Sequence, residues 1–265
     1  MHGKSENRDD YQDVPRPLAA MARDLPDGHH IPAHRHRRAQ LIYGTSGAMT
    51  VVTDRGSWVV PATRAVWVPP GVTHAVTCTG TVRMRTLYLE PAAAPGLPGD
   101  PVVVSVSRLL RELIDEATRL PLAYEVAGRD GRLMDLLLLE LDPHPVPALH
   151  LPAPTDPELD RLCSAIRADP GAHWTTATAA ARTHLSPRTL HRRFPAATGM
   201  TLTHWVRQAR LLHAMTLLAR GTPVTSIAAE LGYATPSAFT AMFRRALGVP
   251  PSAYFAVDGA AAEAS

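Results

Sequence analysis

Three histidines and one glutamine in the N-terminal half have the types and the spacing of metal ligands. His34, His36 and Gln40 are all even-numbered, so on one extended strand their side chains would point to the same face. His74 follows the turn sequence Pro-Pro-Gly and would approach from a second strand. Three imidazoles and an amide oxygen can hold one divalent ion such as Zn, Ni, Mn or Fe. The same side chains can instead line a pocket for a small-molecule effector, and both interpretations stay open.

A different chemistry is concentrated in the C-terminal half, where arginine dominates. Residues 155–258 hold 11 arginines against 6 acidic residues, whereas the net charge of the whole chain is only +3. Guanidinium groups pair well with phosphates and base edges. This part of the chain is therefore predicted to bind a polyanion.

The elements that must position these groups differ between the two halves. Residues 40–89 contain short runs rich in Val, Thr and Trp, separated by turn sequences, which predicts a small β-sandwich or barrel. Apolar residues at helical spacing then predict one helix near 106–117 and a second over 132–141. Leucines surround most of the second helix, so we expect one side to contact the barrel and another side a second copy of the chain. Burial within a single chain is the alternative.

The helical half contains an internal repeat. A shift of 49 residues aligns Ala179 with Ala228. It also aligns Ser186 with Thr235, Pro187 with Pro236, Phe194 with Phe243 and Gly199 with Gly248. Each copy has a short Ala-rich helix, a turn, a hydroxyl residue that can cap, a proline at the first helical position and a second amphipathic helix. The repeat predicts two helix-turn-helix motifs. The apolar helix expected between them, over 202–218, would span about 25 Å and hold two heads against successive major grooves, which recur about every 34 Å.

The repeat resembles the DNA-binding domain of the AraC/XylS family of bacterial transcription regulators. The similarity covers about residues 155–257 and rests on SPRTLHRRF from Ser186, IAAELGY from Ile227 and GVPPSAY from Gly248. It implies seven helices, with recognition helices near 187–197 and 236–247. His184 stands where the family usually has glycine in the first turn, and Pro195 interrupts the first recognition helix. We therefore expect a left-handed His184 and a short or kinked first helix.

The predicted DNA contacts follow from the faces of these two helices. Arg188, His191 and Arg192 lie on one side of the first helix and form the base-reading candidate. Small residues on the second helix suit phosphate or thymine-methyl contacts, so specificity is expected mainly from the first. The complete predicted set is Arg188, Thr189, His191, Arg192, Arg193, Thr235, Ser237, Thr240 and Arg244.

The histidine pattern of the N-terminal half resembles the two cupin motifs. Gln40 takes the place of the usual glutamate, and Cys78 that of an asparagine. The resemblance implies that His34, His36, Gln40 and His74 form the ligand set, while the neutral amide removes a charge that a dication would favour. Arg35, Arg37 and Arg38 are expected at the surface. A metal-dependent dioxygenase or isomerase with an accessory DNA-binding domain is the alternative function. No acid–base pair accompanies the histidines, so we predict that the protein is not an enzyme.

The predicted fold is α+β, with a cupin-like β-barrel over residues 15–95, dimerisation helices over 96–142 and a proline-rich linker over 143–154. A double helix-turn-helix domain over 155–258 follows, and residues 1–14 and 259–265 are expected to be flexible tails. The predicted function is sequence-specific transcription regulation, in which a homodimer binds double-stranded promoter DNA. The N-terminal domain is expected to sense a small effector or a metal. If the protein is an activator, it is also expected to contact RNA polymerase. Two widely separated cysteines and the absence of an apolar leader or span predict a cytoplasmic location without membrane contact.

Overall fold

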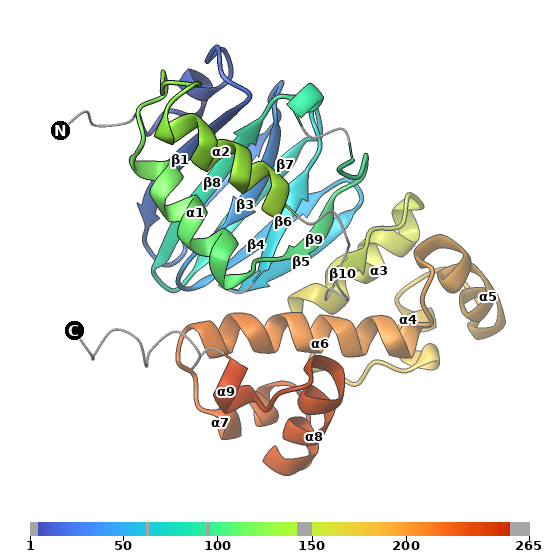
Figure 1. Cartoon of the computed structure of the whole chain (residues 1–265). Helices are drawn as coiled ribbons and strands as arrows, with labels where there is room; N and C mark the ends of the chain where they lie inside the picture. The colour runs from blue at the N-terminus through green and yellow to red at the C-terminus, as the bar shows by residue number, and fades with distance from the viewer. Residues whose placement is uncertain (1–4, 62–63, 94–95, 142–149, 255–265) are drawn as a thin grey trace. The chain divides into compact units, whose positions relative to one another are not determined.

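The chain forms two compact units. The computed structural model describes residues 5–61, 64–93, 96–141 and 150–254 (Figure 1). The first unit comprises residues 1–53 and 60–148, and the second comprises residues 54–59 and 149–265. A short segment of the N-terminal half, residues 54–59, therefore belongs to the second unit. Within the described ranges, no helix has the length and apolar character needed to cross a membrane.

The first unit contains one complete antiparallel sheet with the strand order β1-β8-β3-β6-β9. Its strands are β1 (Leu18–Leu25), β3 (Ala39–Tyr43), β6 (Arg64–Val68), β8 (Val82–Leu89) and β9 (Val102–Ser105). β3 is central, and Gln40 on it lies opposite Tyr88 on one side and Val68 on the other. This register places the Gln40 side chain next to β8.

Three further strands of the first unit, β4 (Ala48–Thr53), β7 (His74–Thr79) and β2 (His30–His34), are neighbours in that order in a second antiparallel sheet. The pairing of β2 with β7 shifts register between Ile31 and His34, and it places His34 directly opposite His74. The predicted approach of His74 from a second strand is thereby confirmed.

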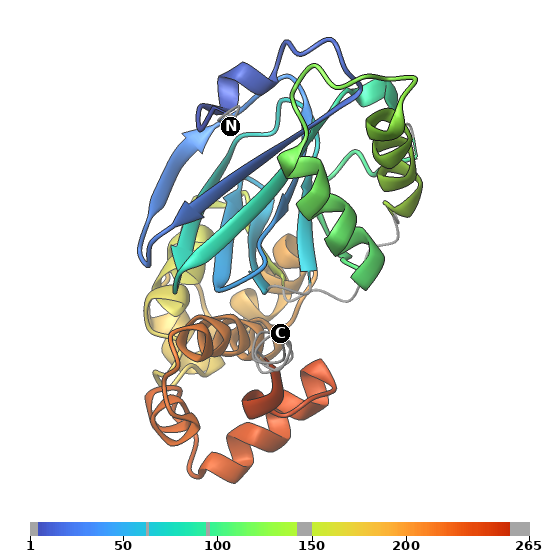
Figure 2. The same ribbon diagram turned by 60° about the vertical axis from the view of Figure 1, so that its left-hand side comes forward.

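Two helices cover the outer face of the first sheet, as Figures 1 and 2 show. α1 (Arg108–Arg119) begins at the N-cap Ser107, whose side chain accepts a hydrogen bond from the Leu110 N–H. α2 (Arg129–Glu140) follows it and buries Met134 and Leu137. These side chains join those of β1, β3, β6 and β8 in one apolar core. The predicted helices near 106–117 and over 132–141 are thus present with shifted ends.

In its described part, the second unit contains two short paired strands and seven helices. The strands are β5 (Gly56–Pro61), of which residues 56–59 belong to this unit, and β10 (His150–Pro152). The helices are α3 (Pro157–Ala168), α4 (Thr176–Ala181), α5 (Pro187–Thr198), α6 (Leu202–Ala219), α7 (Val224–Glu230), α8 (Pro236–Leu247) and α9 (Pro251–Tyr254). α6 lies in the sequence between the two repeats and buries Trp205, Val206, Ala209 and Leu212.

The repeat appears in the structure as two equivalent helix pairs, α4–α5 and α7–α8. The side chains of Ser186 and Thr235 cap α5 and α8 by accepting from the N–H three residues later, and proline follows each cap. Both helices end at a left-handed glycine, Gly199 and Gly248. Two helix-turn-helix motifs are therefore present, as the caps and prolines predicted.

The first recognition helix is not short, and the expected left-handed conformation of His184 is wrong. α5 runs through Pro195 to Thr198 and is as long as α8, with 12 residues each, because the proline removes only one backbone N–H near the end of the helix. His184 is not left-handed, since none of the described residues other than glycine has a positive φ. Its N–H instead donates to the Glu158 carboxylate at 2.6 Å, so a hydrogen bond to α3 holds this turn.

The expected tail, connector and linker also differ from the structure. Residues Arg8–Tyr11 form a 3-10 helix, and Tyr11 is fully buried against Tyr88, so residues 1–14 are not simply a flexible tail. Residues Val102–Ser105 form β9 rather than connector. A second 3-10 helix spans Pro91–Ala93. Of the expected linker, residues 143–149 lie outside the described residues and His150–Pro152 form β10. The expected tail over 259–265 also lies outside them.

The packing of Gly232 predicts a specific loss of stability. Gly232 and Gly221 both have left-handed φ, 73° and 75°, and each follows the end of a helix. A Cβ on Gly232 would lie 2.6 Å from the Gly171 carbonyl oxygen, whereas nothing lies within 4 Å of one on Gly221. We expect Gly221→Ala to lower the free energy of unfolding by about 1–2 kcal/mol through φ strain alone. Gly232→Ala should cost a further ~1–3 kcal/mol. Equal urea midpoints for the two variants would contradict this packing.

Candidate ligand centre and DNA-reading surface

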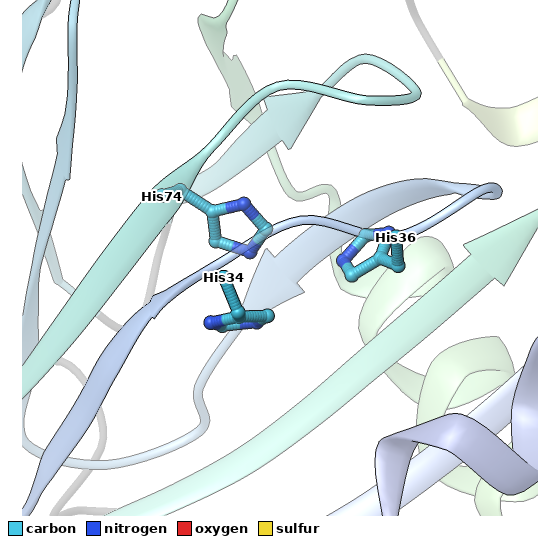
Figure 3. Close-up of side chains that lie close together, drawn as sticks. All are labelled: His34, His36 and His74. Atoms are coloured by element: carbon cyan, nitrogen blue, oxygen red, sulfur yellow. The ribbon is translucent and has the colours of Figure 1, made fainter.

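Four side chains of the first unit converge as the sequence predicted, although not by the predicted route. We call His34, His36, His74 and Gln40 the histidine centre. His34 ends β2, Gln40 lies in β3 and His36 lies in the turn between them, so the three residues do not share one strand and the parity argument is wrong. One ligand atom from each histidine nevertheless lies within 4.8 Å of the others, and Figure 3 shows the three rings gathered beside their strands.

Each histidine has one ring nitrogen against a backbone carbonyl. The Nδ1 atoms of His34, His36 and His74 lie 2.8, 2.6 and 3.0 Å from the carbonyl oxygens of residues 32, 38 and 72, respectively. A carbonyl oxygen only accepts hydrogen bonds, so these contacts favour the tautomer with hydrogen on Nδ1. In that tautomer each Nε2 atom carries a lone pair, the form in which an imidazole nitrogen binds a metal ion.

The Gln40 amide has a defined direction. The Thr86 hydroxyl donates to the Leu41 carbonyl, so its oxygen accepts from the Gln40 Nε2 amide at 2.8 Å. The Gln40 Oε1 atom therefore points the other way, to the Nε2 atoms of His36 and His74 at 2.8 and 3.0 Å. The amide oxygen thus faces two imidazole nitrogens.

Burial lowers the pKa of two histidines of this centre. His74 is almost fully buried, and desolvation lowers its pKa to about 4. Desolvation also lowers the pKa of His34, and the Pro32 carbonyl partly opposes it. Both imidazoles are consequently unprotonated near neutral pH, which is the state that binds metal ions.

Arg38 and Cys78, which are close to the centre in the sequence, are both buried. Arg38, expected at the surface, is fully buried because its guanidinium donates to the carbonyls of Gln12, Val14 and Arg16 and pairs with Glu90. Arg35 and Arg37 are exposed, as expected. Cys78 is buried in β7, and burial raises the pKa of its thiol to about 11.

Sequence reasoning missed the residues that orient Gln40. Thr86 and Tyr88 alternate along β8, and both contact the Gln40 amide nitrogen, at 2.8 and 3.4 Å. The sequence did contain a signal, because residues two apart on a strand place their side chains on the same face of the sheet. What the sequence did not show was the register that brings Gln40 opposite Tyr88.

The exposed side of α5 carries the predicted base-reading residues. Arg188, His191 and Arg192 are all exposed, and their side chains have no hydrogen bond or ion pair within the described part of the chain. Leu190 and Phe194 on the opposite side are fully buried. α5 thus presents two guanidinium groups and one imidazole on a single outward face.

The equivalent side of α8 carries smaller groups around an open concave surface. Ser237, Thr240 and Arg244 line this surface, together with Pro236, Ala241, Arg245 and Gly248. Ser237 and Arg244 are exposed, while Thr240 is half-buried. Short side chains beside two guanidinium groups suit a phosphate backbone better than a base edge.

Three of the residues predicted to contact DNA also have partners inside the protein. The Thr189 and Thr235 side chains take part in the caps of α5 and α8. Arg193 forms an ion pair with Asp156, the N-cap of α3. Arg210 similarly donates to backbone carbonyls of residues 170 and 172. Within the described part of the chain, no side-chain hydrogen bond or ion pair is found for the other members of the predicted set: Arg188, His191, Arg192, Ser237, Thr240 and Arg244.

A β-sheet unit with a buried histidine centre is joined in this chain to a helical unit with two helix-turn-helix motifs, which is the organisation of a one-chain DNA-binding regulator. Residues 20–141 match the AraC-like ligand binding domain, and residues 179–256 match a helix-turn-helix domain of the AraC type. The chain is also similar to the HTH-type transcriptional regulator NimR of Escherichia coli K12, with 32% identity over 225 residues, 85% of this chain and 82% of that protein. The chain belongs to the AraC family of transcription regulators and binds DNA through its helix-turn-helix domain.

Other similarities cover a smaller part of the chain or most of it. The HTH-type transcriptional activator RhaR of Pectobacterium carotovorum is 39% identical over 98 residues, 37% of this chain and 34% of that protein. The DNA-binding domain of AdpA in complex with a target DNA is 31% identical and covers 42% of this chain and 100% of its own, with a TM-score of 0.38. ToxT from Vibrio cholerae is 12% identical over 91% of this chain and 97% of its own, also with a TM-score of 0.38.

Proposed function

We propose that this regulator reads promoter DNA mainly through α5 and is controlled by one divalent metal ion in the histidine centre. The observation that carries the metal proposal is the hydrogen-bond count at His36 and His74. Each ring has an acceptor oxygen at both nitrogens, at 2.6 and 2.8 Å for His36 and at 3.0 Å twice for His74. A neutral imidazole has one hydrogen for these two acceptors, so one lone-pair contact remains uncompensated in either tautomer.

A cation bound by the Nε2 atoms and the Gln40 oxygen would compensate that contact. Neighbouring ligands at right angles around an ion, each at about 2.1 Å, lie about 3 Å apart. The Gln40 Oε1 atom lies 2.8 and 3.0 Å from the Nε2 atoms of His36 and His74. The backbone carbonyls at Nδ1 are the usual outer partners of metal-binding histidines.

The ion would join segments that are separate in the sequence. His34, His36, Gln40 and His74 would hold it, and the ion would supply a fixed positive charge that links β2, β3 and β7. Imidazole and amide ligands suit Zn, Ni, Mn or Fe. A small effector could reach such an ion past His34, the least buried histidine of the three.

For DNA recognition, we assign base reading to Arg188, His191 and Arg192 on α5. Arginine can make two hydrogen bonds to guanine in the major groove. Ser237, Thr240 and Arg244 on α8 are assigned to phosphate and thymine-methyl contacts. The proposal is supported by the free guanidinium groups on α5 and by the short side chains on α8.

We also propose that the protein is a homodimer joined through α1 and α2. Leu139 of α2 is 82% exposed, and Leu136 of α2 and Leu109 of α1 are 40% and 48% exposed. Leucines on the uncovered sides of adjacent helices form an apolar surface that a second copy could bury. The regulator would act on promoter DNA in the cytoplasm, and as an activator it would contact RNA polymerase.

Metal binding is tested with His74→Ala. Wild-type protein should take up one Zn, Ni, Mn or Fe ion per chain, and the variant none, because a buried ligand is lost. His30→Ala is the matched control, since His30 is exposed on β2 and its ring shares a hydrogen bond with the Thr77 hydroxyl. Gln40→Glu should tighten binding by adding a negative charge. Elemental analysis and titration calorimetry measure these outcomes. Wild-type protein that binds none of the four ions would leave the histidine centre as an effector pocket.

Base reading is tested with Arg192→Ala. This change should relax preference at one or two operator positions by about 1–3 kcal/mol, because a two-bond arginine contact distinguishes bases. Arg244→Ala should weaken all sequences alike and reduce the salt slope by about one counterion. Ser237→Ala should change preference less than Arg192→Ala, and Arg161→Ala on α3 serves as the control. Titrations against single-base-pair operator variants at two salt concentrations separate these effects. If Ser237→Ala alters base preference while Arg192→Ala does not, the two helices have the opposite roles.

The dimer is tested with Leu139→Glu. The carboxylate would have to be buried at the proposed interface, so the variant should be monomeric at micromolar concentration, where the wild type is dimeric. Val52→Glu is the control, because Val52 is 45% exposed on β4 outside the α1–α2 surface. Light scattering gives the mass of each. A monomeric wild type, free and on operator DNA, would refute the interface.

A further inference from the structure

Strand β10 joins two parts of the second unit that are far apart in the sequence. It pairs with β5 in antiparallel register, with His150 opposite Trp58 and Pro152 opposite Gly56. The His150 and Trp58 rings stack, with centroids 4.6 Å apart and planes at 13°. The Ala153 N–H donates to the Arg55 carbonyl at 3.2 Å and closes the pairing. Residues 54–59 are held to the second unit by these contacts.

β5 and β10 pack closely at Gly56. Gly56 has a φ of 145°, and a Cβ on it would lie 2.3 Å from the Leu151 carbonyl oxygen and 2.5 Å from His150 Nε2. Leu151 and Trp58 are both buried. The two strands are therefore in closer contact than any residue other than glycine at position 56 would allow.

The other side of β10 is held by α6. The Trp205 indole N–H donates to the Pro152 carbonyl at 3.2 Å, and Trp205 is fully buried. The Trp205 ring also packs edge-on against Phe194 of α5, with centroids 6.2 Å apart. Phe194 lies on the side of α5 opposite Arg188 and Arg192. Trp205 thus contacts both β10 and the helix assigned to base reading.

The core behind α8 is built differently. Phe239 and Phe243 of α8 pack against each other and against Tyr233 and Tyr254. These four rings come from α8 and from segments adjacent to it in the sequence. The two DNA-contacting helices consequently have separate aromatic supports, and Trp205 belongs to that of α5.

We propose that Trp205 is a positioning residue for α5 and that β10 sets its place, so that a displacement of residues 54–59 reaches α5 and not α8. This inference rests on the proposed base-reading role of α5. Since Thr53 and Val60 on either side of this segment belong to the first unit, a change in the first unit can pull on β5 through the chain itself. β10 then carries the change to Trp205 and Phe194.

The first test removes one hydrogen bond and keeps the ring. In the full-length protein, Trp205→Phe loses the N–H bond to Pro152. Trp67→Phe is the matched control, because the Trp67 indole donates to the Pro98 carbonyl at 2.8 Å in the first unit. We expect Trp205→Phe to weaken operator binding about two- to tenfold, as for one lost hydrogen bond, with an unchanged salt slope. Discrimination should fall only at the base pairs identified by Arg192→Ala, and Trp67→Phe should bind as the wild type does.

The second test disrupts the pairing of β5 with β10 by a substitution in β5. Gly56→Ala places a methyl group against the Leu151 carbonyl. Gly28→Ala is the control, because Gly28 also has a positive φ, 76°, but nothing lies within 4 Å of an added Cβ there. Gly56→Ala should reproduce the Trp205→Phe pattern, and Gly28→Ala should not. The double variant of Trp205→Phe and Gly56→Ala should lose less than the sum of the single losses, because both act through the same contact.

Hydrogen exchange at the Ala153 N–H gives a readout that does not depend on the base-reading assignment. Operator DNA should slow this exchange in the wild type and not in Trp205→Phe. Unchanged exchange on DNA binding, or equal losses at the positions of both helices in Trp205→Phe, would overturn the inference. If Arg192→Ala has no positional effect while the Ala153 exchange responds as expected, the assignment of α5 as the base reader has failed and the link through β10 stands.

Discussion

The direction of the Gln40 amide determines what the first unit can bind. Thr86 uses its hydroxyl hydrogen on the Leu41 carbonyl, so it can only accept from Gln40, and the amide oxygen must then face His36 and His74. Buried polar atoms are costly unless they are paired. One hydroxyl on β8 therefore decides that the interior between the two sheets presents an oxygen, rather than a nitrogen, to the imidazoles. A glutamate at position 40 would bring charge, whereas glutamine provides a directed dipole.

The two helices that we propose to contact DNA differ in how they are held. α8 follows a turn made by left-handed Gly232, while the turn before α5 lacks a left-handed residue and is tied to α3 by Glu158. Arg193 adds a second tie from α5 to α3 through Asp156. α5 is therefore supported by α3 and, through the contact of Phe194 with Trp205, by α6. Side chains that read bases need a rigid support, because a two-bond contact is sensitive to small displacements.

Local signals in the sequence predicted the helical unit well and the β unit less well. Cap residues, prolines and terminal glycines mark α5 and α8, because each acts on neighbouring backbone groups. Pro195 led to the wrong prediction of a short helix, because the free-energy cost of a proline depends on its position in the helix. The histidines were correctly grouped, but the chain turns after His34, so their shared parity was not the cause. Arg38 and β10 could not be predicted, since both depend on partners from distant segments: the carbonyls of residues 12–16 and the edge of β5. A strand of three residues, one of them a proline, has no strand signal of its own.

The membership of residues 54–59 in the second unit limits how freely this protein can be divided. A DNA-binding fragment that begins at the linker would keep β10 but lose β5, which leaves Leu151 without cover and the Ala153 N–H without its acceptor. A chimera that exchanges the ligand-binding domain for that of a relative would face the same mismatch, because the borrowed β5 must accept this β10. The boundary between the two modules is thus not a single point in the chain. Recombination between family members at the linker would be tolerated only where the hairpin around residue 56 is exchanged together with the helices.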